Sequence, residues 1–527
     1  MQGLALVTVL LLLVLLLVEL GRRSSVPYPT WMVLAGLGIA LLPGMPRLDL
    51  EPDFVFLVFL PPILYSGAWR TSWSEFRRNL APITYLAIGL VLATTVAVAA
   101  IAVALVPGMS WPVAFVLGAI VSPSDTAAAL AVCQRLRVPR RIVTILEGEG
   151  LVNDATGLIV MRIALVAVAT GGFSLASAAS SFLLAGAGGV VLGYLAGSGI
   201  ARVHARIRDP QISTALSLVA PYAVYLVAMQ AQVSAVIAVV AAGLVVSRRS
   251  TQVFDPATRL TAIPVWNTLV MLLDGLGFVL LGLQVPHHCA DCTNLSWPQL
   301  LGLCAVVSLA VVLVRLATVF PLNAILRLLP VRWRGAPLAD WRAVTMIGWT
   351  GMRGIVSLAG ALAVPVLTDD GGAFPQRDLL IVLVFAVILT TIVLQSLSLP
   401  WLIRRLGLET GDEEWAQERD ARAAMTSAAS ARLAALRGAA HHPAALLEHL
   451  AEALAARQAL EAAVDCNECV QRGDTRLAAE REVERELLAA ERQALHEARL
   501  RGVVSEPVFR RLERRLDLAA ERLAALD

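Results

Sequence analysis

The sequence predicts an all-α polytopic membrane protein with about 13 transmembrane helices, followed by a helical cytoplasmic C-terminal domain. Of the 527 residues, 57% are hydrophobic and only 16% are charged, and the mean hydropathy is +0.72. Soluble proteins are about a quarter charged. The apolar residues also gather in runs of roughly 18 to 28, which is enough for a helix to cross a ~30 Å hydrocarbon layer. Finally, arginine-rich loops alternate with arginine-poor loops along the chain.

Thirteen apolar runs are the predicted spans. No basic residue precedes the first run and no small-residue cleavage site follows it, so we expect a retained span rather than a signal peptide. The runs cover residues 2–20, 27–45, 53–69, 80–106, 112–134, 141–169, 174–203, 211–230, 232–249, 262–285, 298–328, 341–367 and 377–405.

The arginines predict the orientation, because basic loops stay on the cytoplasmic side. Alternate loops hold 21 arginines, whereas the short loops between them hold only Arg47 and Arg377. A miscounted span would destroy this alternation, so it supports the number of spans as well. We therefore expect the N-terminus outside and the C-terminus in the cytoplasm.

Two domains are expected: a transmembrane domain over 1–406 and a cytoplasmic tail over 407–527. The tail is rich in Ala, Glu, Arg and Leu, with apolar residues three and four positions apart, as in amphipathic soluble helices. A folded or paired appendage is the simpler interpretation, and a regulatory or dimer-supporting domain is the alternative.

Neither charge nor cysteines indicate a further ligand. The net charge of +3 comes mostly from the loop arginines and does not suggest a nucleic-acid partner. The pairs Cys289/Cys292 and Cys466/Cys469 each lack a second ligand pair, so they are weak signals for a metal. We expect no cofactor and no bound metal beyond a transported monovalent cation.

Ionisable residues inside the spans are costly and mark a binding site, a proton relay or an ion pair. There are five acids against three bases, so about two acids would remain free if each arginine paired with a carboxylate. Glu147 and Asp274 are equally well explained as structural charges, and a structural pairing is favoured for Arg162. The eight residues are Asp125, Glu147, Glu149, Asp154, Asp274, Arg162, Arg315 and Arg353.

The run 141–169 places several of these on one helix. Glu149 and Asn153 stack at i and i+4, with Asp154 beside them around the helix. Arg315 lies deep in "AVVLVRLATVF" with no other charge at its depth. We expect it to pair with Glu149 and to hold two helices together.

Two spans carry irregular helix chemistry. Pro123, between Ser122 and Ser124, removes a backbone donor at mid-span and predicts a break. Gly351 and Gly354 loosen the helix around Arg353, although close helix packing also explains glycines there. A pair of broken spans indicates a transporter's midplane site. Asp125 and Arg353 would offset the partial charges of the half-helix ends.

Four motifs in order resemble the bacterial sodium/proton antiporters of the monovalent cation:proton antiporter superfamily. More narrowly, they are similar to its Asn-Asp branch, which includes the animal sodium/proton exchangers. The resemblance covers essentially residues 1–405. The motifs are "LPPILYSGAWRTSWSEFRRNL", "SPSDTAAAL", "EGEGLVNDATG" and "GWTGMRGIVSLAGALAVP".

The resemblance implies a homodimer in the bacterial inner membrane, with inverted repeats and with broken spans 5 and 12 crossing near the midplane. It makes Asp154 the carboxylate that binds ion or proton, and Asn153 its pair partner. Asp125 and Ser124 belong to the broken span 5. An Asn before the key Asp is associated with electroneutral exchange.

The sequence also departs from the family pattern. Gly150 follows Glu149 where many relatives read "GES", so a possible hydroxyl ligand is missing. Thr126 follows Asp125 where relatives often have Pro or Ala-Val, and the acid that some carry near Ser66 is absent. These differences leave the choice between Na+ and K+ open.

The expected function is electroneutral Na+/H+ antiport across the lipid bilayer, with Li+ or K+ as other candidate substrates. A partly desolvated carboxylate resists ionisation, so a proton and a bare cation compete for the oxygens of Asp154. Oxygen donors from Asp125, Ser124 and Asn153 would complete the shell of the cation. A K+/H+ antiporter is the nearest alternative. An uncoupled channel or a binding-only sensor would lack proton-coupled flux. An intramembrane enzyme is disfavoured because the spans hold no HExxH and no Ser/His pairing.

Overall fold

The computed structural model describes residues 2–24, 26–42, 51–291, 296–321, 324, 340–368 and 372–408, together with short stretches from 425 onward. These residues form helices, and the only β pairing among them is an isolated bridge between Leu367 and Ala373. The chain divides into two compact units, Met1–Thr410 and Gly411–Asp527. In the second unit the described stretches are helical, the longest covering 425–436. The cytoplasmic location of the tail stays a prediction.

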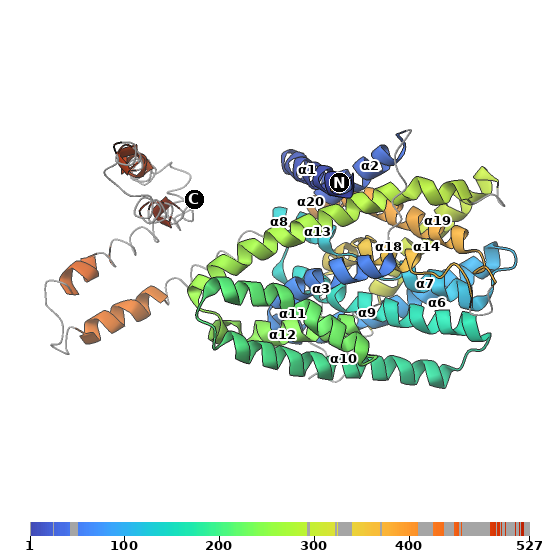
Figure 1. The fold of residues 1–527 in the computed structure, drawn as a ribbon, viewed down its shortest axis with the longest axis horizontal. Coiled ribbons are helices and arrows are strands. Elements are labelled where there is room, and N and C mark those ends of the chain that lie inside the picture. Colours follow the sequence, from blue (N-terminus) through green and yellow to red (C-terminus); the bar gives the residue numbers. More distant parts are fainter. Residues whose placement is uncertain are drawn as a thin grey trace. The chain divides into compact units, whose positions relative to one another are not determined.

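The described helices of the first unit follow the predicted runs (Figure 1). Two of them, labelled η, are π-helical segments inside longer helices. The sequence does not predict these two π-helical segments. The elements are α1 (Gln2–Arg23), α2 (Tyr28–Ala40), α3 (Pro52–Arg70), α4 (Trp73–Arg78), α5 (Leu80–Thr84), η1 (Tyr85–Leu90), α6 (Val91–Leu105), α7 (Trp111–Val121), α8 (Ala127–Arg135), α9 (Arg140–Thr170), α10 (Leu175–His204), α11 (Pro210–Gln230), α12 (Ala235–Val253), α13 (Pro256–Asp291), α14 (Trp297–Val319), α17 (Trp341–Trp349), α18 (Ile355–Leu362), α19 (Arg377–Thr390), η2 (Thr391–Gln395) and α20 (Ser396–Leu406).

Each of the thirteen predicted runs contains at least one described helix, and the short helix α4 lies between two runs. Among the described residues, seven helices are long and apolar enough to cross a membrane, and three shorter apolar helices accompany them. The described part of the chain is therefore helical, with the apolar helices of a multi-pass membrane protein. The number of thirteen crossings stays a prediction.

Helices α10, α11 and α12 pack on one another and lie together at one side of the unit (Figure 1). The long helix α13 packs along α2 and also contacts α3 and α11. Between these groups lie α7, α9 and α18, which contact one another. The buried centre of the unit is thus built around the two interrupted spans and α9.

Both interruptions lie where the sequence placed them. Helix α7 ends at Val121 and α8 begins at Ala127, while α17 ends at Trp349 and α18 begins at Ile355. The two non-helical segments touch, since the Asp125 amide donates to the Met352 carbonyl at 2.7 Å. Non-helical backbone at membrane depth persists only when it is buried in protein or lines a cavity. Both conditions hold here.

Candidate ion-binding site

The predicted pair of Glu149 in α9 and Arg315 in α14 forms a bidentate ion pair. The Arg315 guanidinium donates to Glu149 Oε1 at 2.5 Å and to Oε2 at 2.9 Å, and both side chains are 1% exposed. Arg315 also donates to the carbonyl of Ile347, in the last turn of α17, at 3.0 Å. One arginine therefore ties α9, α14 and the first half of an interrupted span together.

Asn153 and Ser124 join the same network instead of facing open space. The Asn153 amide donates to the Ser124 carbonyl at 2.8 Å and to its hydroxyl at 3.0 Å. That hydroxyl donates to Glu149 at 2.7 Å and accepts from Arg315 at 3.3 Å. A hydroxyl has one proton and two lone pairs, so its bonding capacity is used up. In this conformation Asn153 and Ser124 hold the α7–α8 interruption against α9.

Arg353 lies at the end of α7, the first half-helix. Its Nε donates to the Val121 carbonyl at 2.8 Å and its guanidinium also reaches the carbonyls of Ser122 and Gly351. The last carbonyls of a helix lack internal partners and carry partial negative charge. A guanidinium therefore satisfies this helix end without a carboxylate.

Asp125 lies at the start of α8, the second half-helix. Its carboxylate accepts from the Ala127 amide at 2.9 Å, which places negative charge at a helix N-terminus. Gly354 packs directly against this carboxylate, and a Cβ at that position would overlap it. Pro123 lies two residues before Asp125, so one short segment supplies both the backbone break and the acid.

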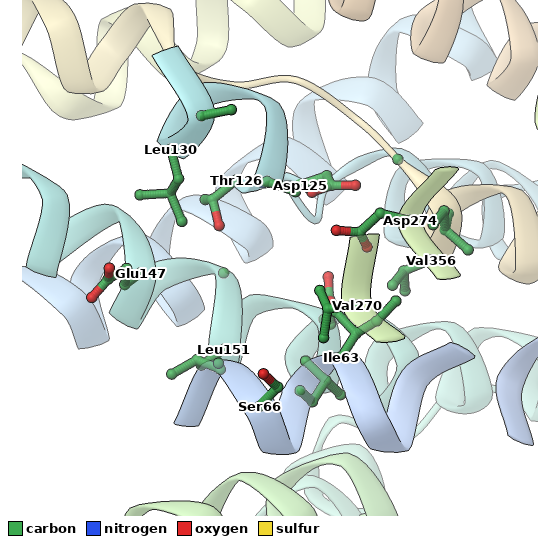
Figure 2. A pocket seen from close by; sticks show the side chains of 18 of the residues that line it. Ile63, Ser66, Asp125, Thr126, Leu130, Glu147, Leu151, Val270, Asp274 and Val356 are labelled. Carbon is green, nitrogen blue, oxygen red and sulfur yellow. Dashed lines mark hydrogen bonds between the residues drawn. The ribbon is translucent and has the colours of Figure 1, made fainter. Parts of the chain in front are cut away.

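A cavity of about 330 Å³ opens beside these half-helix ends. Asp154, Asp125 and Asp274 all line it, from α9, the α7–α8 interruption and α13 respectively, and Figure 2 shows the last two directed into it. Asp154 and Asp274 are buried, at 8% and 6% exposure. Three carboxylates from separate elements therefore converge on one small space.

Asp154 is not neutralised by a base. Among the described residues, no arginine lies within ion-pair distance of it, since Arg315 holds Glu149 and Arg353 holds backbone carbonyls. About two of the five acids are expected to be free, and three of them, Asp125, Asp154 and Asp274, have no arginine partner among the described residues. Arg353 bonds to a helix end rather than to a carboxylate, while Glu147 lies near Arg140, which is not one of the three bases counted in the spans. The predicted pairing of Arg162 is wrong for the described residues: its side chain is exposed and has no carboxylate partner there.

The cavity continues from the carboxylates to the surface. Its lining includes Arg70 at the end of α3, Gln134 near the end of α8 and Glu147 in the second turn of α9. Arg70 and Gln134 are exposed. All three lie at the end of the helices that carries the arginine-rich loops. The buried acids are thus reached from the arginine-rich side.

Sequence reasoning did not assign Asp274, Thr126 or Tyr28 to the site, although all three line the cavity. The signal for Asp274 is its position inside an apolar run, which marks it as a costly charge but gives it no role. Thr126 is distinguished in the sequence only as a departure from the family pattern, and Tyr28 carries no charge that would mark it. Ser66 lines the cavity too. The four Cys residues of the two Cys-x-x-Cys pairs lie outside the side chains that the structure describes.

Comparisons with known proteins agree with this architecture. A family described as "Sodium/hydrogen exchanger, transmembrane" matches residues 8–405. An uncharacterized Na+/H+ exchanger of Mycobacterium tuberculosis is 34% identical over 99% of this chain and 96% of its own length. A sodium, potassium, lithium and rubidium/H+ antiporter of Bacillus pumilus is 33% identical over 72% of this chain and 58% of its own length.

The fold is shared with a solved structure. The sodium proton antiporter MjNhaP1 of Methanocaldococcus jannaschii superposes with a TM-score of 0.61 at 19% identity, over 78% of this chain and 99% of its own. The family match spans both interrupted helices, α9 and the cavity. The protein is therefore a transporter rather than an enzyme, and the chain belongs to the transmembrane sodium/hydrogen exchanger family.

Proposed function

We propose that this protein exchanges one Na+ for one H+ by alternating access, with Asp154 binding the cation and the proton in turn. The exchange is electroneutral because one positive charge replaces another on a single carboxylate. The carrier changes sides only when that carboxylate is neutralised, which couples the two fluxes.

One observation carries the proposal: a buried carboxylate faces a cavity open to one side and has no arginine partner among the described residues. A permanently paired acid would hold neither a cation nor a proton. Here the two buried arginines are satisfied elsewhere, by Glu149 and by the end of α7. The Asp154 carboxylate is therefore available to bind ions that enter the cavity.

The remaining site residues divide into two groups. Asp125 lines the cavity with Asp154 and supplies a second carboxylate to a cation. Asn153 and Ser124 hold the interrupted span against α9 through their hydrogen bonds. The Asn153 Oδ1 has no hydrogen-bond partner among the described residues, so it stays a proposed oxygen ligand of the cation. Half-helix ends at a transporter's midplane commonly provide oxygen ligands and partial charges for ions.

The finer membrane arrangement is part of the proposal. The arginine-rich loops support an orientation with the open end of the cavity in the cytoplasm, the N-terminus outside and the tail inside. The resemblance to bacterial antiporters supports thirteen spans, inverted repeats and a homodimer in the inner membrane.

A second candidate is K+/H+ exchange. The Bacillus pumilus relative is named for potassium as well as sodium, lithium and rubidium, so a relative's site is described as accepting larger cations. Exchange measured against Li+, Na+, K+ and Rb+ at equal concentrations separates the two candidates.

The test is Asp154→Asn in proteoliposomes, with Na+/H+ exchange driven by dilution. The amide cannot bind a proton or neutralise a cation, so exchange should fall to the level of empty liposomes. Asp378→Asn is the matched control, because Asp378 is a half-exposed acid at the start of α19. Exchange retained by Asp154→Asn at the rate of the control would rule out the proposal.

A further inference from the structure

The side chain of Thr126 occupies the space beside Gly150. A Cβ added to Gly150 would overlap the Thr126 hydroxyl oxygen, and would lie 3.1 Å from its Cγ2 and 3.3 Å from its Cβ. Thr126 therefore fills, from the α7–α8 interruption, the position that a side chain on α9 would otherwise take. The two departures from the family pattern at 126 and 150 meet at one point in space.

The Thr126 hydroxyl makes no hydrogen bond to any of the described residues. Thr126 is the N-cap of α8, where a threonine ordinarily accepts a hydrogen bond from the first turn. Its side chain makes no capping bond, and Asp125 accepts from Ala127 instead. Thr126 is 8% exposed, and its hydroxyl oxygen is not among the fully inaccessible polar atoms. The small exposed part of the residue therefore includes this oxygen. A buried hydroxyl without a protein partner thus faces the cavity.

Its position is next to both proposed ion-binding acids. Gly150 and Asp154 stand at i and i+4 on α9, so they share one face of that helix. Thr126 contacts this face one turn from Asp154 and directly follows Asp125 in the chain. Figure 2 shows Thr126 beside Asp125 at the start of α8, near the part of α9 that carries Leu151. All of these residues line the same cavity.

We propose that the Thr126 hydroxyl is an oxygen ligand of the transported alkali cation and that it contributes to cation selectivity. The proposal rests on the proposed cation/proton exchange at Asp154. A hydroxyl keeps two lone pairs for a cation, whereas those of Ser124 are already used by Asn153 and Arg315. The Thr126/Gly150 pair thereby places on the interrupted span a hydroxyl that α9 does not supply.

The first test is Thr126→Val, which removes the hydroxyl and keeps the side-chain shape. The apparent KM for Na+ should rise about tenfold, equivalent to ~1.4 kcal/mol of lost binding. The Li+:Na+:K+ preference should change as well, because one ligand contributes differently to ions of different size. Thr170→Val is the matched control, since Thr170 is an exposed hydroxyl at the far end of α9. Its KM should equal that of the unchanged protein.

The second test moves the hydroxyl to the facing helix. Thr126→Ala empties the space beside Gly150, so its KM for Na+ should rise like that of Thr126→Val. Adding Gly150→Ser should recover most of the lost affinity, because the new side chain enters the vacated space. Binding of radiolabelled Na+ to the purified variants checks affinity without turnover.

An unchanged KM and cation preference in Thr126→Val would overturn the inference. So would a lowered maximal rate that is the same for every cation, because that marks a structural role. Failure of the proposed function looks different, since Asp154→Asn would then retain exchange. The inference fails alone if Asp154→Asn is inactive while Thr126→Val binds radiolabelled Na+ as tightly as the Thr170→Val control.

Discussion

The buried charged residues fall into two kinds: those in an ion pair and those without an arginine partner among the described residues. Glu149 and Arg315 neutralise each other at 1% exposure, and the Ser124 hydroxyl and the Ile347 carbonyl use up further donors and acceptors of the pair. Removing one member of a buried pair leaves an uncompensated charge, which is far more costly than losing an exposed pair. This pair therefore belongs to the framework, and the proposed transport role falls to the carboxylates without an arginine partner.

A stability measurement separates the framework charges from surface ones. Glu149→Gln should destabilise the protein by about 3–5 kcal/mol, because it leaves Arg315 buried without a counter-charge. Glu19→Gln breaks the exposed Arg23–Glu19 pair at 2.8 Å and should cost less than ~1 kcal/mol. Thermal unfolding in detergent compares the two variants. Equal melting temperatures would show that the buried pair is not structural.

At the scale of helices, the two interruptions create the site. Each half-helix end meets an opposite charge: Arg353 at the carbonyls of α7 and Asp125 at the first amides of α8. The close approach of α18 to Asp125 requires Gly354, since a Cβ would occupy the space of the carboxylate. The geometry of the cavity wall therefore depends on a missing side chain.

Gly354→Ala tests this contact. The added methyl group should displace Asp125 and lower the exchange rate about tenfold or more, as overpacking of a tight interior costs ~1–3 kcal/mol. Gly199→Ala in α10 is the control, because a Cβ there meets nothing within 4 Å. Proteoliposome exchange is compared at equal amounts of reconstituted protein. Matching rates for the two variants would mean that the α18 approach to Asp125 is unimportant for transport.

How much of this was predictable follows from the same elements. A proline between two serines and glycines around an arginine are enough to locate both interruptions. The isolated position of Arg315 deep in its helix requires a carboxylate partner on another helix, and Glu149 is the expected one. The partners of Arg353 were not predictable, because backbone carbonyls are available at every position in a sequence. The Thr126–Gly150 contact joins two helices, so its spacing along the chain carries no signal. The roles proposed for these residues stay predictions.

At the scale of the whole transmembrane unit, the cavity opens toward one identifiable end of the helices. It extends from Asp125 and the buried Asp154 and Asp274 to the exposed Arg70 and Gln134, at the end of the helices with the arginine-rich loops. Basic loops face the cytoplasm, so we interpret this conformation as open to the inside. An antiporter needs an opposite conformation in which the same acids face outward.

Thiol labelling tests the sidedness. In a background with the six native cysteines replaced, Gln134→Cys should react with a membrane-impermeant maleimide in inside-out vesicles and stay unlabelled in right-side-out vesicles. A cysteine at Gly172, in the loop between α9 and α10 at the other end of α9, is the control and should show the reverse pattern. Labelling of Gln134→Cys only from the outside would invert the proposed orientation.

The central claim is that one carboxylate, Asp154, serves two competing cations. The most direct measurement is the apparent KM for Na+ in proteoliposomes over a series of pH values, equal on both sides of the membrane. Proton binding removes Asp154 from the pool that can take Na+, so by mass action KM should rise as pH falls, approaching about tenfold per pH unit. The maximal rate at saturating Na+ should change little in the same range. A KM that is independent of pH, with a maximal rate that collapses in acid, would show that proton and cation bind at separate groups and would contradict the account.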